Sequence, residues 1–211
     1  MKDIGIYIHM PFCKQKCYYC DFVSYSGAEN LIEEYIRKLN EELNTELLKI
    51  KNYNVKTIYI GGGTPSLCSK EDFEKIDIKK YVMKDTEFKI EINTGSASYE
   101  KLKLYKEIGV NRLSIGMQST NNKILKEIGR IHTYEEFLEI YQIARNLEYK
   151  NINVDVMIGL PNQSVDDVEE TITKVVNLNP EHISVYSLIL EEGTKLEKLV
   201  EEGILKLPSE D

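Results

Sequence analysis

Three of the four cysteines lie within eight residues near the N-terminus, spaced C-x3-C-x2-C at Cys13, Cys17 and Cys20. Cysteine thiolates are the ligands of iron–sulfur clusters, and one short loop can present three of them to a single cubane. Because four ligands are usual, three would leave one iron open to a substrate. The spacing therefore predicts an iron–sulfur cluster with one free coordination position.

Zinc is the main alternative for these thiols. A structural zinc site is closed by four ligands, and the fourth would have to be Cys68, His9 or Asp21, none of which stands at a usual finger spacing. A disulfide would leave one cysteine of the three unpaired. Cys68 stands before a helical pattern and is predicted to be a small buried residue. The ligand count and spacing favour the iron–sulfur cluster, with zinc still open.

The composition excludes some classes of protein. The 211 residues carry a net charge of −8, and such an acidic surface repels phosphate backbones, so no nucleic-acid partner is expected. The N-terminus has no long apolar stretch, which predicts a cytoplasmic chain without secretory signal or membrane span. In a reducing compartment, clustered cysteines are more often metal-binding than disulfide-bonded.

Strand-like and helical runs alternate along the chain. The strand-like runs span 4–9, 55–61, 88–93, 111–116, 153–158 and 181–187, and the helical patterns span 31–49, 70–81, 98–108, 121–147 and 165–177, the fourth broken near Gly129. Six β–α repeats predict an α/β fold with parallel strands joined by right-handed crossovers. The alternatives are an open doubly wound sheet and a full or partial barrel, formed as one domain.

The strands show a second pattern, in which one face is apolar and the other polar. Phe88, Ile90 and Ile92, for example, alternate with Lys89, Glu91 and Asn93. If the apolar set packs under the helices, the polar set lines a shared interior that includes Tyr7, Glu91, Gln118 and Asp155. This pattern predicts a polar ligand near the carboxyl ends of the strands, although a sheet with one wet face would give the same alternation.

Ordered motifs extend along most of the chain. They are Tyr7-Ile8-His9-Met10-Pro11-Phe12-Cys13, Cys17-Tyr18-Tyr19-Cys20-Asp21-Phe22, Gly61-Gly62-Gly63-Thr64-Pro65, Glu91-Ile92-Asn93, Ser114-Ile115-Gly116-Met117-Gln118-Ser119, Gly129-Arg130-Ile131-His132-Thr133 and Asp155-Val156-Met157-Ile158-Gly159-Leu160-Pro161. In these motifs the chain resembles the radical S-adenosylmethionine (SAM) superfamily. More narrowly, it resembles the oxygen-independent coproporphyrinogen III oxidase-like group. The resemblance implies a partial (β/α)6 barrel of parallel strands, with the cluster loop at 10–22.

The resemblance also implies the cofactors and their contacts. It implies a [4Fe–4S] cluster on Cys13, Cys17 and Cys20, and SAM chelated to the open iron. Contacts to SAM are implied for Tyr7, Tyr19, Gly62, Gly63, Thr64, Glu91, Gln118, Arg130, Asp155 and Ser187. In this reading Glu91 accepts from the SAM ammonium, Arg130 pairs with its carboxylate, and Asp155 bonds its ribose hydroxyls.

One position separates two branches of the group. Enzymes that decarboxylate coproporphyrinogen carry a further cysteine two places after the third, where this chain has Phe22. The Cys20-Asp21-Phe22 form is similar to the haem-chaperone branch. It implies haem, a haem-accepting protein, and an electron donor such as flavodoxin or ferredoxin as partners. A radical enzyme acting on coproporphyrinogen III or another small acidic substrate is the alternative, and a truncated inactive domain is the third option.

The length also bears on the domain organisation. Full members of the family continue past a Leu-Pro-Ser-Glu-Asp segment into a C-terminal domain, whereas this sequence stops at Asp211. We therefore expect residues 1–187 to form the barrel. Residues 188–211 are expected to be a connecting tail that leads toward the absent C-terminal domain.

Overall fold

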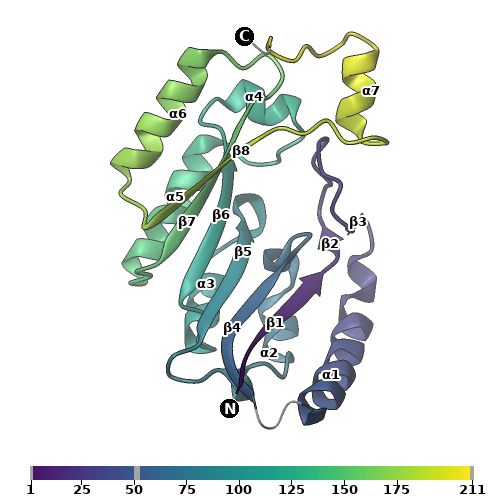
Figure 1. Cartoon of the computed structure of the whole chain (residues 1–211), viewed down its shortest axis with the longest axis vertical. Helices are drawn as coiled ribbons and strands as arrows, with labels where there is room; N and C mark the ends of the chain where they lie inside the picture. Colours follow the sequence, from purple (N-terminus) through teal and green to yellow (C-terminus); the bar gives the residue numbers. More distant parts are fainter. Residues whose placement is uncertain (1, 50–52, 210–211) are drawn as a thin grey trace.

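The computed structural model of the chain describes residues 2–49 and 53–209. Within them, the main sheet has six parallel strands in the order β1-β4-β5-β6-β7-β8. The strands are β1 (Lys2–Met10), β4 (Tyr53–Gly62), β5 (Glu87–Asn93), β6 (Arg112–Gln118), β7 (Ile152–Ile158) and β8 (His182–Ser187). They lie side by side in chain order, and the curved sheet is a half-barrel (Figure 1). The predicted α/β partial barrel is thereby confirmed.

Helices connect the strands. They are α1 (Ile32–Lys49), α2 (Lys70–Glu74), α3 (Tyr99–Glu107), α4 (Asn122–Glu127), α5 (Tyr134–Asn146), α6 (Val165–Asn177) and α7 (Lys195–Glu201). Short 3-10 turns are η1 (Glu29–Leu31), η2 (Pro65–Leu67), η3 (Lys79–Tyr81) and η4 (Thr94–Ser96), and β2 (Phe12–Cys13) pairs with β3 (Tyr25–Ser26). No helix within the described ranges is both long and apolar enough to cross a membrane.

One predicted helix ends earlier in the structure than the sequence suggests, and another is broken where the sequence predicts. The helix predicted over 70–81 ends at Glu74, because Ile76 and Ile78 are both buried, and residues two apart cannot share one face of a helix. The break predicted near Gly129 is confirmed. Gly129 has φ of +76° just after α4, which is the left-handed conformation in which glycine commonly ends a helix.

The core lies between the sheet and the helices. Ile60, Ile90 and Ile115 have no exposed surface, and they pack with helix residues such as Leu102 and Phe137. Along β5 the apolar residues are buried while the intervening polar ones are partly exposed, as the alternation predicts. The helices therefore cover the apolar face, and the polar face of the sheet is left to form the inside of the half-barrel.

Candidate functional site

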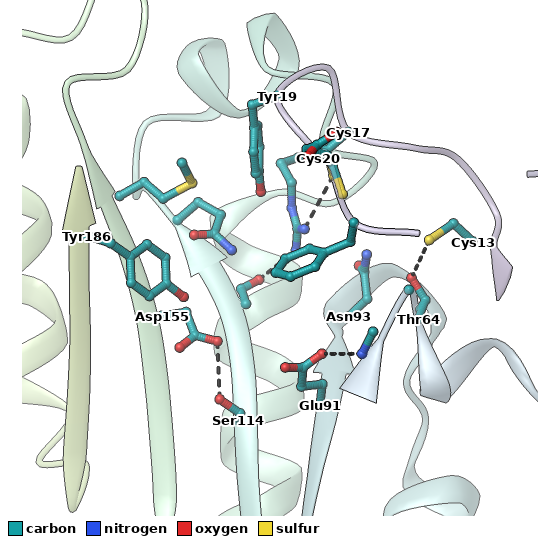
Figure 2. A pocket seen from close by; sticks show the side chains of 18 of the residues that line it. Cys13, Cys17, Tyr19, Cys20, Thr64, Glu91, Asn93, Ser114, Asp155 and Tyr186 are labelled. Atoms are coloured by element: carbon teal, nitrogen blue, oxygen red, sulfur yellow. Dashed lines mark hydrogen bonds between the residues drawn. The ribbon is translucent and has the colours of Figure 1, made fainter. Parts of the chain in front are cut away.

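A cavity of about 660 Å³ opens at the carboxyl ends of the strands, a volume within the usual range for ligand pockets. Figure 2 shows the cysteine loop on one side of it and the polar ends of β5 to β8 on the other. Of the residues predicted to contact cofactors, all but Tyr7 line this cavity: Cys13, Cys17, Tyr19, Cys20, Gly62, Gly63, Thr64, Glu91, Gln118, Arg130, Asp155 and Ser187.

The three loop cysteines are free thiols, and all three line the cavity. Cys13 is buried at the end of β2, where its sulfur accepts from the Thr64 hydroxyl at 3.4 Å. Cys17 accepts from Arg130 Nη1 at 3.5 Å. Burial raises the pKa of Cys20. Within the described residues no three such side chains already have the arrangement of a metal site, so the thiols share a cavity without being drawn together.

The structure also separates the candidates for a fourth zinc ligand. Cys68 is 1% exposed and lies outside the cavity lining, and burial raises its pKa to about 12. Both ring nitrogens of His9 are engaged, by the Tyr7 hydroxyl at 3.0 Å and the Val23 carbonyl at 2.7 Å. Asp21 alone of the three candidates lines the cavity. Of the three candidates, Cys68 and His9 are therefore placed away from the thiols or already engaged, and only Asp21 is left as a fourth ligand.

The glycine loop packs directly against the cysteine segment. The amides of Gly63 and Thr64 donate to the carbonyls of Met10 and Phe12, both at 2.8 Å. A Cβ on Gly63 would lie 2.8 Å from each of those carbonyls and 3.1 Å from Cys13 Sγ. Gly62 has φ of +107°, a conformation that side chains disfavour. These glycines are needed for the approach of the loop to the cysteine segment as well as for a ligand.

A hydrogen-bonded clamp centred on Lys101 holds the segment that follows the glycine loop. Lys101 Nζ donates to the carbonyl of Ser66 at 2.6 Å and to that of Ser96 at 3.0 Å. The two serine hydroxyls also bond each other at 2.7 Å. Burial lowers the pKa of Lys101. The clamp joins η2 to η4 and so fixes the glycine loop relative to the end of β5.

Glu91 lies on the β5 wall, with its carboxylate facing the cavity (Figure 2). It accepts from the Tyr59 hydroxyl and from the Gly62 amide at 3.1 Å, and burial raises its pKa. Tyr7 does not line the cavity. Its ring is 56% exposed and packs edge-on against Tyr59, with centroids 5.3 Å apart. Tyr59 lines the cavity instead, and its place between Ile58 and Ile60 is the signal that could have identified it.

Gln118 and Arg130 carry polar atoms without partners at the end of β6. Gln118 is buried at φ of +72°, beside a register shift in the β6–β7 pairing, and its Oε1 has no hydrogen-bond partner among the described residues. Arg130 Nη2 donates to the Gly116 carbonyl at 2.7 Å, while its Nε has no such partner. Buried polar atoms are rarely left unpaired in folded proteins. Both side chains line the cavity, so a polar ligand there would supply hydrogen-bond partners for these unpaired atoms.

Asp155 is held by its neighbours in the sheet. One carboxylate oxygen accepts from Ser114 Oγ at 3.2 Å and the other from Asn153 Nδ2 at 2.6 Å. Asn153, 2% exposed, also donates to Ser114 Oγ at 2.8 Å. Tyr186 points its hydroxyl toward Asp155 (Figure 2), and burial raises the pKa of that hydroxyl. Sequence reasoning did not name Ser114, Asn153 or Tyr186 as site residues.

These residues fit the cofactors that the sequence implies. Free thiols are the ligands that iron–sulfur clusters use. A carboxylate, a guanidinium and a second carboxylate, contributed by Glu91, Arg130 and Asp155, line the same cavity and are complementary to an amino acid joined to a ribose. Tyr19 packs with the small apolar cluster of Met157 and Leu160 at the mouth.

Comparisons with known proteins show the family to which the chain belongs. The family model described as the Radical SAM superfamily matches residues 7–175. The protein "Heme chaperone HemW" of Bacillus subtilis is 40% identical over 97% of this chain and 55% of its own length. The chain thus spans about half the length of the curated relatives it matches.

Solved structures agree on the fold. Coproporphyrinogen III oxidase (HemN) from Escherichia coli, described as a radical SAM enzyme, superposes with a TM-score of 0.86 at 24% identity, over 99% of this chain and 49% of its own. The radical SAM methyltransferase TsrM from Kitasatospora setae, solved with a [4Fe–4S] cluster, gives a TM-score of 0.66 at 12% identity, over 96% of this chain and 39% of its own. The family implies a [4Fe–4S] cluster and SAM as cofactors. The chain therefore belongs to the radical SAM superfamily.

Proposed function

We propose that this chain is the cofactor-binding part of a haem chaperone, which binds a [4Fe–4S] cluster and SAM and holds haem for transfer to haem proteins. One observation carries the proposal: a single cavity joins the three loop thiols to Glu91, Arg130 and Asp155. The 40% identity to a relative named as a haem chaperone supports the choice of branch.

In this proposal Cys13, Cys17 and Cys20 hold the cluster, whose chemistry is one-electron reduction of the SAM sulfonium. Glu91 accepts hydrogen bonds from the SAM ammonium once the carboxylate is ionised, with the Tyr59 hydroxyl and the Gly62 amide fixing its position. Arg130, anchored on the Gly116 carbonyl, pairs with the SAM carboxylate.

The remaining contacts orient the nucleoside. Asp155 accepts from the ribose hydroxyls, and Asn153 and Ser114 hold its carboxylate in place. Gly62, Gly63, Thr64, Gln118 and Ser187 line the rest of the cavity, and Tyr19 shields the cluster side of it. Tyr7 contributes indirectly, by packing on Tyr59.

The haem-chaperone branch is favoured by the residues after Cys20. Phe22 is 68% exposed and lines the cavity at the position where the resemblance implies a further cysteine in the decarboxylating enzymes. An exposed aromatic side chain suits a flat apolar ligand better than it suits bulk water. We propose a flavodoxin-like or ferredoxin-like electron donor and a haem-accepting protein as the protein partners.

The test uses the 211-residue chain after anaerobic reconstitution with iron and sulfide. We expect about four irons per chain, the electron paramagnetic resonance signal of a reduced [4Fe–4S] cluster, a change in that signal on addition of SAM, and saturable haem binding in an absorbance titration. The same sample is assayed for decarboxylation of coproporphyrinogen III. Rapid decarboxylation, or the lack of saturable haem binding, would overturn the chaperone proposal.

A further inference from the structure

Lys89 is a positive charge inside the half-barrel that the proposed cofactor contacts do not use. It lies on β5 with its side chain lining the cavity, and its ammonium stands 4.4 Å from the centroid of the Tyr59 ring. Among the described residues, no carboxylate oxygen lies within 4.0 Å of the Lys89 ammonium nitrogen, the limit for an ion pair. The ring face fixes the ammonium by a cation–π contact and leaves its N–H donors available.

The neighbouring strand adds a second cation at the same level. Arg112 on β6 is the register partner of Lys89, so the two side chains lie side by side on one face of the sheet. Arg112 Nη1 pairs with Glu87 at 3.3 Å, while its buried Nε has no partner among the described residues. Glu87 offsets the charge of Arg112, so Lys89 is the cation without an ion-pair partner at this level of the sheet, in a chain whose net charge is −8.

Lys89 lies deeper than the residues assigned to SAM. It precedes Glu91 by two residues on the same face of β5, and a strand rises by about 3.3 Å per residue, so the backbone of Lys89 lies about 7 Å farther from the mouth. The SAM ammonium and carboxylate already have partners in Glu91 and Arg130. An anion at Lys89 must therefore belong to a second ligand.

The mouth of the same cavity carries exposed apolar side chains. Phe22 and Ile189 both line it, and both are 68% exposed. Phe22 follows the cysteine loop and Ile189 follows the end of β8, so both lie at the open end of the barrel. One cavity thus combines apolar surface at its mouth with an unpaired cation in its depth, which matches a ligand with an apolar body and a carboxylate tail.

We propose that Lys89 is a carboxylate-binding subsite that receives a propionate of the tetrapyrrole bound in this cavity, with Tyr59 as its positioning residue. The inference rests on the proposed function and adds to it the part of the ligand that enters the barrel. Arg112 pairs with Glu87, so that carboxylate is matched by a cation other than Lys89.

The experiment compares haem with its dimethyl ester, in which both carboxylates are blocked. Absorbance titrations are run on the reconstituted wild-type chain, on Lys89→Met and on Lys103→Met, a control at an exposed lysine on α3. For wild type and the control we expect haem to bind about tenfold more tightly than the ester, a difference that one charge-assisted hydrogen bond can supply. In Lys89→Met haem should bind about tenfold more weakly, and the ester should be unaffected.

The outcomes separate this inference from the function on which it rests. Equal binding of haem and ester by the wild type overturns the subsite and leaves the chaperone proposal standing, as does an equal loss of both ligands in Lys89→Met. Failure of the wild type to bind either ligand overturns the chaperone proposal and the subsite with it. Thermal unfolding of each variant, followed by circular dichroism, checks that the fold is unchanged.

Discussion

The wall of strands β4 to β7 and the cysteine loop over residues 14–23 differ sharply in how they are held. In the wall, Ile60, Ile90 and Ile115 are fully buried and pack under helices. Cys13, just before this segment, is buried, but none of residues 14–23 is, and Phe22 and Val23 are 68% and 64% exposed. Few bonds tie the loop to the barrel, among them those from the Tyr18 amide and the Gln15 amide group to Ile128 and Gly129, each at 3.0 Å.

The difference shows that the strand wall acts as the scaffold, whereas the loop supplies the thiols. The wall presents Glu91 and Asp155 from strands whose opposite faces are packed, so their positions are set by folding. The loop presents thiols that line the cavity without converging, so bonds to metal would complete their arrangement. Groups that bind ligands often stand on loops carried by a rigid scaffold for this reason.

The largest expected effect tests the cysteine loop as the source of the cluster ligands. Cys17→Ala should abolish the cluster, because two thiolates remain where three are needed, while Cys68→Ala should retain it, because Cys68 is buried outside the cavity. Iron and sulfide content and the electron paramagnetic resonance signal after reconstitution measure the effect. Equal losses in the two variants would contradict the proposed ligand set.

The next effect tests the packing of the strand wall. Ile115→Ala should lower the free energy of unfolding by about 2–5 kcal/mol, because it leaves a cavity in a fully packed core. Phe22→Ala, at an exposed loop position, should change it by less than about 0.5 kcal/mol. Urea unfolding followed by circular dichroism compares the two. A loss at Phe22 as large as that at Ile115 would show that the loop is packed as firmly as the wall.

The third effect concerns His132, which lies two residues after Arg130, the side chain that contacts Cys17, and is itself 3% exposed. Burial, helped by the charge of Arg130, lowers the pKa of His132 from 6.5 to about 3. Between these values the unfolded chain binds a proton that the folded chain does not. Stability should therefore fall as the pH falls from 6.5, by about 1.4 kcal/mol per pH unit from this group.

The measurement is the slope of unfolding free energy against pH in the wild type and in His132→Met. The variant should lose that contribution to the slope, whatever its absolute stability. If both proteins show the same slope between pH 6 and pH 4, His132 is not held neutral by burial and belongs with the solvent-accessible region.

Much of the fold follows from local pattern. The six strands and the break at Gly129 are confirmed, because period-2 alternation and a glycine at positive φ are properties of short segments. The early end of α2 was missed because the burial of Ile76 and Ile78 depends on what packs around them. The β2–β3 pair and α7 were also missed, since two-residue strands and a seven-residue helix give weak periodic signals.

The sequence by itself determined the family, the alternating strands and the thiols available for a cluster, since residue type and spacing carry these. Only the tertiary structure decided which side chains share a cavity. It brought Tyr59 to the lining in place of Tyr7, engaged His9 with Tyr7 and Val23, and buried Cys68 away from the other thiols. It also set Lys89 beside Arg112 with its ammonium unpaired. Register between strands far apart in the chain fixes these contacts, and no local pattern encodes that register.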